Sequence, residues 1–493
     1  MYRKPDRSQI VLEDFYLPFG GRLSANNRWV RTAQLIPWEL VEDMYAASFK
    51  AENPDGRPPI SARIAFGALY IRENENLTDV RTVEYIAENP YAQYFLGLLE
   101  FSTEPLFDPS MMTYCRKRFS KEDITRINEE VYRRANPTAV APENPEPEPE
   151  KENTKDESDQ GNKTDSDNVK PIGNNGTLVL DATVAPADIR FPTDLSLLNE
   201  CRENIERIID EIWEKTPRVG HKTSYNRKKA RKSYLSIAKQ RKPRKGKIRK
   251  VIEAQLDYLK RALESIDKII SEIGEDTLPA KDLARLNVIR EVFRQQTEHF
   301  ADPKKSIPDR IVSLRQPHVR PIVRGKAGAP VEFGQKMTLS VVDGFTFIER
   351  QSFDNFNEGI TLIESAEKYL KRHGCYPEAI LADKIYRNRE NRTFCRERSI
   401  RLSGPKLGRP KANEIEAERD QAYADSCARN IVESRNGIAK RRYGLDLIMA
   451  ILPDSAQTEA AMNVFAMNVA HLLRALLRLL GFTVDCLDLW ISS

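Results

Sequence analysis

The stretch Thr177-Leu178-Val179-Leu180-Asp181-Ala182-Thr183 is an apolar, β-favouring run that delivers a carboxylate. A low-complexity acidic segment precedes it, so the run opens a new part of the chain. It predicts a buried central strand with Asp181 at its C-terminal end, a common way to build a metal or catalytic site. One strand-end Asp can equally well cap or turn the chain. Asp181 is a candidate metal ligand only in combination with two later acids, Asp383 and Glu433.

The pattern downstream of Asp181 predicts a sheet interrupted by helices. Helical spacing runs from about 195 to 309, and strand patterns return at 310–314, 334–342 and 345–353. Asp343-Gly344 between the last two is a strong hairpin signal. A helix from Glu358 to His373 then leads to a strand over 377–383 that ends in Asp383, and helices follow from Asn391 and Glu414. Strands and helices mixed in this way predict an α/β fold with a mixed sheet.

The chain divides by composition into four parts. Residues 1–136 carry short helical patterns, and Thr78 with Asp79 begins a helix that belongs either to a helix-turn-helix-like pair or to ordinary helix packing. Residues 137–175 hold almost nothing apolar, so we expect a disordered acidic linker. Residues 176–453 form the α/β part with its helical insertion, and 454–493 form a C-terminal helical segment.

Charge and cysteine content narrow the class of protein. The net charge is only +5, but acid is concentrated in the linker and base in the middle of the chain, which favours a polyanionic partner. The six cysteines show no metal-ligand spacing and indicate reduced thiols. The N-terminus lacks the apolar core of a signal peptide, and the apolar run at 464–480 is interrupted by Asn468, His471 and two arginines. We therefore expect a cytoplasmic protein with no membrane association.

The basic middle predicts DNA contact. No acidic residue occurs between Glu214 and Glu253, where basic side chains crowd together. Such a run gains by displacing counterions from a phosphate backbone, although it can also be a solvated loop. The loop over 316–336 is basic as well, and an isolated histidine such as His318 is more often a structural residue or a DNA contact than a general base. The candidate DNA contacts in these two stretches are Arg227, Lys228, Lys229, Arg231, Lys232, Arg320, Arg324 and Lys326.

Two strand-end carboxylates and one on a following helix can converge at the rim of a sheet. Oxygen ligands with open positions suit Mg²⁺ or Mn²⁺. Two such ions about 3.5–4 Å apart activate a nucleophile and stabilise the leaving oxygen of a phosphodiester. Because Asp and Glu are abundant here, the spacing alone is a weak signal.

Several blocks of sequence resemble bacterial insertion-sequence transposases of the DDE class. The blocks that begin at Asp181 and at Leu381-Ala382-Asp383 are similar to the first and second acidic motifs of that family. Arg429, Glu433 and Lys440 are similar to the third, the Tyr-x2-Arg-x3-Glu-x6-Lys signature, although position 426 is Ser426 instead of Tyr. The block from Glu88-Asn89-Pro90-Tyr91 to Ser110 resembles the DNA-binding N-terminal domain of these enzymes.

This resemblance implies a specific protein. It implies an RNase H-like catalytic domain after an all-α DNA-binding domain, with Asp181, Asp383 and Glu433 holding Mg²⁺ or Mn²⁺, two ions in number. It implies cleavage at inverted repeats, joining of the 3′-OH to target DNA, double-stranded DNA as partner, a homodimer on DNA and a place on the bacterial nucleoid. Arg429 and Lys440 would contact DNA. The alternatives are a decayed transposase that binds without cutting and a stand-alone metal-dependent nuclease.

Overall fold

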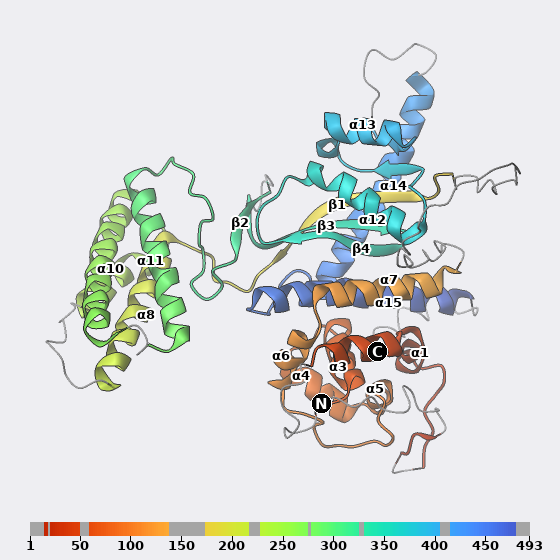
Figure 1. Cartoon of the computed structure of the whole chain (residues 1–493), viewed down its shortest axis with the longest axis horizontal. Helices are drawn as coiled ribbons and strands as arrows, with labels where there is room; N and C mark the ends of the chain where they lie inside the picture. The colour runs from red at the N-terminus through yellow and green to blue at the C-terminus, as the bar shows by residue number, and fades with distance from the viewer. Residues whose placement is uncertain are drawn as a thin grey trace, which may run out of the picture.

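The computed structural model describes residues 14–17, 20–49, 59–137, 173–215, 227–274, 278–324, 330–404 and 415–479. Most of the expected acidic linker, the basic residue Lys326 and the stretch 480–493 lie outside these residues. The fold is mixed α/β, with a helical N-terminal region below the sheet and a helical bundle to one side in Figure 1.

The sheet is mixed, and its central strand is the stretch that contains Asp181. The strand order is β2-β3-β1-β5-β6, with β4 also paired to β3. β1 runs antiparallel to β3 and parallel to β5, and β5 runs parallel to β6. The strands are β1 (Thr177–Pro186), β2 (Arg320–Val323), β3 (Val331–Val342), β4 (Phe345–Ser352), β5 (Ala379–Leu381) and β6 (Arg401–Leu402).

Two local features of the sequence shape this sheet. Asp343 and Gly344 both have positive φ, 50° and 81°, as the tight turn between β3 and β4 requires, so the predicted hairpin is confirmed. At Gly334 an added Cβ would lie 2.1 Å from the carbonyl oxygen of Ala185, so only glycine allows β3 to approach β1 there.

Two strand predictions were wrong. The strand β1 does not end at Asp181 but continues to Pro186, because β3 pairs with it over 179–186. The segment 310–314 is not a strand. Its apolar side chains Ile311 and Leu314 pack against the helical insertion, while Arg310 pairs with Asp194 at 2.6 Å, so the segment serves as a packed connection.

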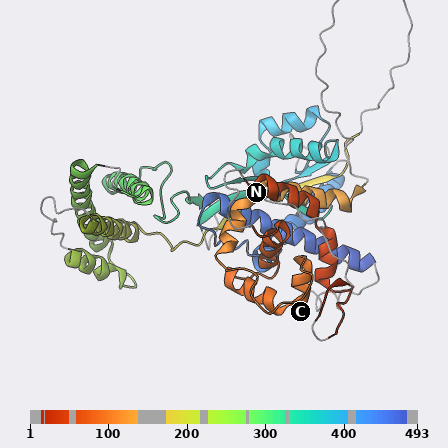
Figure 2. The ribbon, with the colours of Figure 1, turned by 60° about the horizontal axis from the view of Figure 1, so that its bottom comes forward.

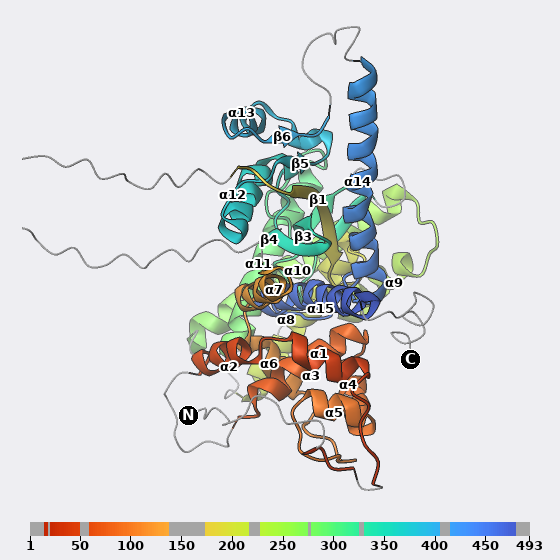
Figure 3. The same cartoon turned by 90° about the vertical axis from the view of Figure 1, so that its right-hand side faces the viewer.

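Helices cover both faces of the sheet. On one face, Thr338 of β3 donates to Thr361 at the start of α12 (3.3 Å). On the other face, Val432 of α14 is buried against Val179 and Val341. Figure 3 shows α14 running past the sheet edge, on the opposite side from α12. The helices of this part are α12 (Thr361–His373), α13 (Arg389–Glu397) and α14 (Ile415–Arg442), with short 3-10 turns η4 (Glu358–Ile360) and η5 (Lys384–Tyr386).

The helical insertion forms a bundle with its own apolar core. Leu198, Leu259 and Ile289 come from three of its helices and are fully buried in that core. Figures 1 and 2 show the bundle standing apart from the rest of the protein. Its helices are α8 (Asp194–Lys215), α9 (Arg227–Ala238), α10 (Lys245–Ile273) and α11 (Ala280–Ala301).

The N-terminal helices pack around aromatic side chains and carry clear start signals. Thr78 accepts from the Arg81 N–H at the start of α4, as predicted. Ser120 and Asp123 form a capping box at the start of α7. The helices are α1 (Arg28–Leu35), α2 (Trp38–Ala47), α3 (Ala62–Asn74), α4 (Asp79–Glu88), α5 (Pro90–Phe95), α6 (Met111–Arg118) and α7 (Lys121–Ala135).

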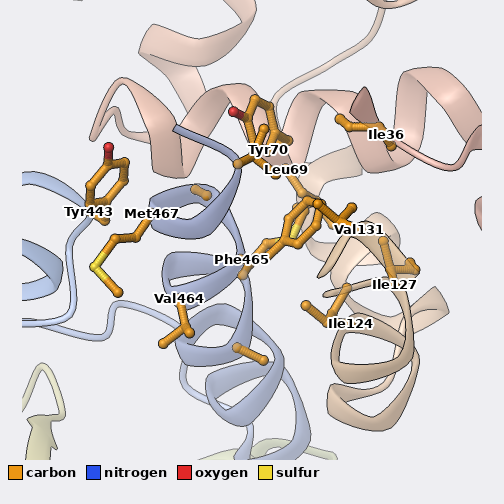
Figure 4. Close-up of a cluster of buried hydrophobic side chains, with 14 of the residues drawn as sticks. Ile36, Leu69, Tyr70, Ile124, Ile127, Val131, Tyr443, Val464, Phe465 and Met467 are labelled. Carbon is orange, nitrogen blue, oxygen red and sulfur yellow. The ribbon is translucent and has the colours of Figure 1, made fainter. Parts of the chain in front are cut away.

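The helix α15 (Pro453–Leu479) joins the N-terminal helices to the sheet. Phe465 is fully buried and meets the rings of Phe66 and Tyr70 edge-on at 5.6 and 5.9 Å (Figure 4). Within the described residues, α15 is the one helix long and apolar enough to cross a membrane, and 72% of its most apolar window is buried inside the protein. Such burial is typical of a core helix, and one hydrophobic core runs through α3, α15 and the sheet.

Candidate functional site

Asp181 and Asp383 follow paired residues of two neighbouring strands. β1 pairs with β5 through Val179 and Leu381. Asp181 and Asp383 each follow two residues later, and side chains two apart point to the same face of a strand. Asp383 lies two residues beyond β5, not at its end as predicted, and caps the turn η5, so β1 has no β5 partner at Asp181. Both residues therefore follow the last paired positions of β1 and β5, and the charge of Arg429 acts on both, at 3.7 Å from Oδ1 of Asp383.

The helix α14 crosses this point and supplies the remaining polar groups. Asn436 donates from Nδ2 to Oδ2 of Asp181 (3.2 Å). The Nη1 atom of Arg429 lies 3.7 Å from Oδ1 of Asp383. Glu433 is exposed and sits four residues after Arg429 and three before Asn436, so all three share one helical face. Glu433 thus lies about one helical turn from Asn436, which contacts Asp181, and from Arg429, which contacts Asp383.

The environment of Asp181 disfavours its negative charge. Burial raises the pKa of the Asp181 carboxyl, and the nearby carboxylate of Glu358 raises it further. A hydrogen bond from the Ala182 N–H and the guanidinium groups of Arg429 and Arg324 act in the opposite direction on this pKa. A half-buried carboxylate with raised pKa is stabilised by any cation placed beside it.

The carboxylates are suitable ligands for a hard divalent cation, but they do not form a complete coordination site. Among the residues that the structure describes, no group of three or more His, Cys, Asp or Glu side chains is close enough to hold a metal ion. The donors are nevertheless all oxygens, as Mg²⁺ and Mn²⁺ prefer. In addition, Oδ1 of Asn436 is buried beside Asp181 and accepts no hydrogen bond. The Asp181 carboxylate and the unused amide oxygen of Asn436 beside it are the kind of oxygen donors that such an ion takes.

The basic run of the sequence forms the exposed helix α9 and the turn after it. Lys228, Lys229, Arg231 and Lys232 are all exposed. Arg227 differs, because its Nη1 and Nη2 atoms bond both oxygens of Asp210 at 2.6 and 3.0 Å and thereby fasten α9 to α8. Four of these five candidates are therefore available on the surface, whereas Arg227 stabilises the packing of α9 on α8.

The other basic candidates occupy different settings. Arg320 donates to the carbonyl of Val319 (3.2 Å) and helps to close its own turn. Arg324 is largely buried and donates to the Ala182 carbonyl at 3.4 Å, directly beside Asp181. Lys440 lies half-buried on α14, seven residues after Glu433. His318 packs edge-on against Phe353 at 4.4 Å, in keeping with a structural residue.

Two residues at the site were missed by sequence reasoning. Glu358 lies in the turn before α12, and its charge acts on both Asp181 and Tyr386. Lys336 of β3 holds it by an ion pair of 3.0 Å. Asn436 is the other, and its signal was available, because it stands three residues after Glu433 on the same helix face. Glu358 had no such signal, since only the folded sheet brings it near Asp181.

Two family models and one relative match parts of the chain. Residues 380–470, which contain Asp383, Glu433 and Asn436, match the family described as transposase DDE domain. Residues 18–118 match the family described as transposase domain (DUF772). A protein of Rhizobium meliloti described as uncharacterized protein ORF8 in nfe locus is 34% identical over 98 residues, which are 20% of this chain and 46% of that protein. No solved structure matches the chain.

Proposed function

We propose that this chain, a member of the DDE transposases, binds the terminal inverted repeats of an insertion sequence. It would cut the DNA there and join the 3′-OH to target DNA. The observation that carries the proposal is the pairing of Val179 in β1 with Leu381 in β5, two residues before Asp181 and Asp383, together with the hydrogen bond from Asn436 of α14 to Asp181. Neither matched family covers Asp181, so its part in the site rests on this register.

We take the sheet to be RNase H-like. The support is its strand order: a central first strand, an antiparallel hairpin on one side and two parallel strands on the other. The helical bundle over 194–301 is then an insertion between the first strand and the hairpin. In this proposal residues 1–136 bind DNA, 137–175 are a linker, 176–453 are catalytic and 454–493 are the C-terminal segment.

Asp181, Asp383 and Glu433 are the residues that would hold Mg²⁺ or Mn²⁺, as a pair of ions. Bound divalent cations would supply the charge that activates a water or 3′-OH and stabilises the leaving oxygen. The protein's own part is positional: Asn436 holds the Asp181 carboxylate by its Nδ2 hydrogen bond. Arg429, 3.7 Å from Asp383, is placed to hold a DNA phosphate at the same point.

Several partners follow from this proposal. The phosphate backbone of double-stranded DNA would be contacted by four residues of the insertion, Lys228, Lys229, Arg231 and Lys232. Five residues of the catalytic part would contact it as well: Arg320, Arg324, Lys326, Arg429 and Lys440. Synapsis of two ends requires a homodimer on DNA. The protein would act in the cytoplasm, on the bacterial nucleoid.

The test is cleavage of linear DNA that carries the element's flanking inverted repeats, with Mn²⁺ present. We expect nicks at the repeat ends and joined products. Asp383→Asn should abolish both while end binding stays within a few-fold, because its loss removes a metal ligand and no DNA contact. Asp446→Asn, an exposed Asp after α14, is the matched control and should cut normally.

The other outcomes identify the alternatives. Binding without nicking would indicate a decayed transposase, which the serine at position 426 favours. Nicking without joined products would indicate a stand-alone nuclease. Loss of end binding in Asp383→Asn would contradict its role as a metal ligand.

A further inference from the structure

The helix α13, which begins six residues after Asp383, carries a stripe of arginines on its outer side. Arg389, Arg392 and Arg396 stand at positions i, i+3 and i+7, so they share one face. Arg389 and Arg396 are exposed and Arg392 is half-buried. The opposite face is buried through Asn391, Phe394 and Cys395. The stripe is therefore the part of α13 that is turned most fully away from the protein.

No carboxylate neutralises the stripe. Within the described chain, none of its three arginines takes part in an ion pair, and the two acids of α13, Glu390 and Glu397, lie on the flank of the helix. Neighbouring arginines, in contrast, have structural partners. Arg398 lies over the Phe394 ring at 4.0 Å, and Arg401 pairs with Asp425 at 2.7 Å. Unpaired positive charge is thus concentrated on the outer stripe.

The stripe is fixed in position relative to the acidic site. Asn391 is buried and donates from Nδ2 to the carbonyls of Gly359 (2.6 Å) and Tyr386 (2.8 Å). Asn388 caps the helix by accepting from the Asn391 N–H at 2.7 Å. An added Cβ at Gly359 would lie 2.6 Å from the Ile385 carbonyl oxygen, which shows how closely the two turns pack. The segment that follows Asp383 is thereby locked to the turn that contains Glu358.

We propose that Arg389, Arg392 and Arg396 form a docking surface for the phosphate backbone of DNA that extends beyond the Asp181–Asp383 site. This inference rests on the proposed function and adds a surface to it. Arginine binds phosphate in a bidentate manner, and three arginines over seven residues span about 10.5 Å of helix. That length equals the rise of about three nucleotides along one strand. The surface therefore positions the strand flanking the cleaved bond without reading its sequence.

The test compares two double variants that remove the same charge. Arg389→Gln/Arg396→Gln alters the stripe, whereas Arg207→Gln/Arg294→Gln alters two exposed arginines of the helical insertion that pair with Asp282 and Glu291. Binding of a duplex of about 40 base pairs and random sequence is followed by fluorescence anisotropy at several salt concentrations. We expect the slope of log K against log salt to become shallower by up to about 1.8 in the stripe variant and to stay unchanged in the Arg207→Gln/Arg294→Gln variant.

A third variant separates charge from folding. Arg389→Lys/Arg396→Lys keeps both charges and should retain the slope of the unaltered protein. A slope in Arg389→Gln/Arg396→Gln equal to that of the unaltered protein, in samples with unchanged circular dichroism, would overturn the inference. If the unaltered protein cuts and joins repeat ends, that result leaves the proposed function intact. If the unaltered protein binds no DNA at all, both proposals fail together.

Discussion

Replacing Asn468 should destabilise the whole protein, because one buried amide connects three of its parts. Its Nδ2 atom donates to the carbonyl of Thr346 in β4 (2.7 Å) and to Oδ1 of Asn128 in α7 (2.8 Å). Its Oδ1 atom accepts from the Thr346 N–H at 2.9 Å. All of these atoms lie in fully or almost fully buried residues.

The size of the effect follows from the groups left without partners. In Asn468→Leu the Thr346 N–H and Oδ1 of Asn128 lose their partner, whereas the Thr346 carbonyl keeps a hydrogen bond from Asn128 at 3.3 Å. Each orphaned buried group costs about 1–3 kcal/mol, so the free energy of unfolding should fall by about 2–6 kcal/mol. That is a large share of the 5–15 kcal/mol typical of a folded protein.

The same helix offers a matched control. Asn463 is also fully buried, but within the described chain neither its Oδ1 nor its Nδ2 atom has a hydrogen-bond partner. Asn463→Leu removes two unsatisfied groups and should be neutral or stabilising. Urea unfolding is followed by the fluorescence of Trp29 and Trp38, which are buried in the N-terminal part of the shared core. An equal loss of stability in the two variants would refute the reasoning.

Three further outcomes are expected. Neutralising the exposed lysines and arginine of α9 (Lys228, Lys229, Arg231 and Lys232) together should make the salt slope of DNA binding shallower by up to about 3.6, and an unchanged slope would mean that this face is only solvated. Asn436→Leu should weaken Mn²⁺ binding by about 10- to 100-fold, because the Asp181 carboxylate loses its hydrogen bond. Electron paramagnetic resonance measures this binding, and an unaltered affinity for Mn²⁺ would contradict the role of Asn436. Burial, with Arg435, Arg474 and Arg478 nearby, lowers the pKa of His471 to about 4, so its contribution to stability is full above pH 6.5 and is lost as the pH falls toward 4. In His471→Gln the free energy of unfolding should therefore fall less steeply with acidification, and an unaltered pH profile would exclude the contribution.

Local patterns in the sequence predicted the parts of the fold that depend on local physics. The Asp343-Gly344 turn, the Thr78 cap and the amphipathic insertion helices each follow from a few adjacent residues. The extent of β1 did not, because the residues after Asp181 are held in the sheet by β3, which begins about 150 residues later. The segment 310–314 is apolar for a reason other than strand formation, since it packs on helices.

Some residues of the candidate site could likewise be predicted from the sequence, and others could not. Asp181, Asp383 and Glu433 were identified from motif resemblance, and the structure adds the pairing of Val179 with Leu381, two residues before the first two acids. Glu358 and Arg324 approach Asp181 through the folding of separate segments, and no spacing in the sequence records that. Arg227 shows the reverse difficulty. It belongs to a basic run, but its partner Asp210 lies on the preceding helix, so composition alone cannot separate it from its exposed neighbours.

The place of α15 in the core has a consequence for synthesis. The helix packs on α3 and α7, yet it leaves the ribosome about 380 residues after α3. At about 5–20 residues per second, the N-terminal helices wait roughly 20–75 s for the side chains that complete their packing. A nascent chain therefore acquires its finished N-terminal region only after the segments bearing Asp181, Asp383 and Glu433 have been made. Maturation of the first part of the protein is in this way timed by the appearance of the last described helix.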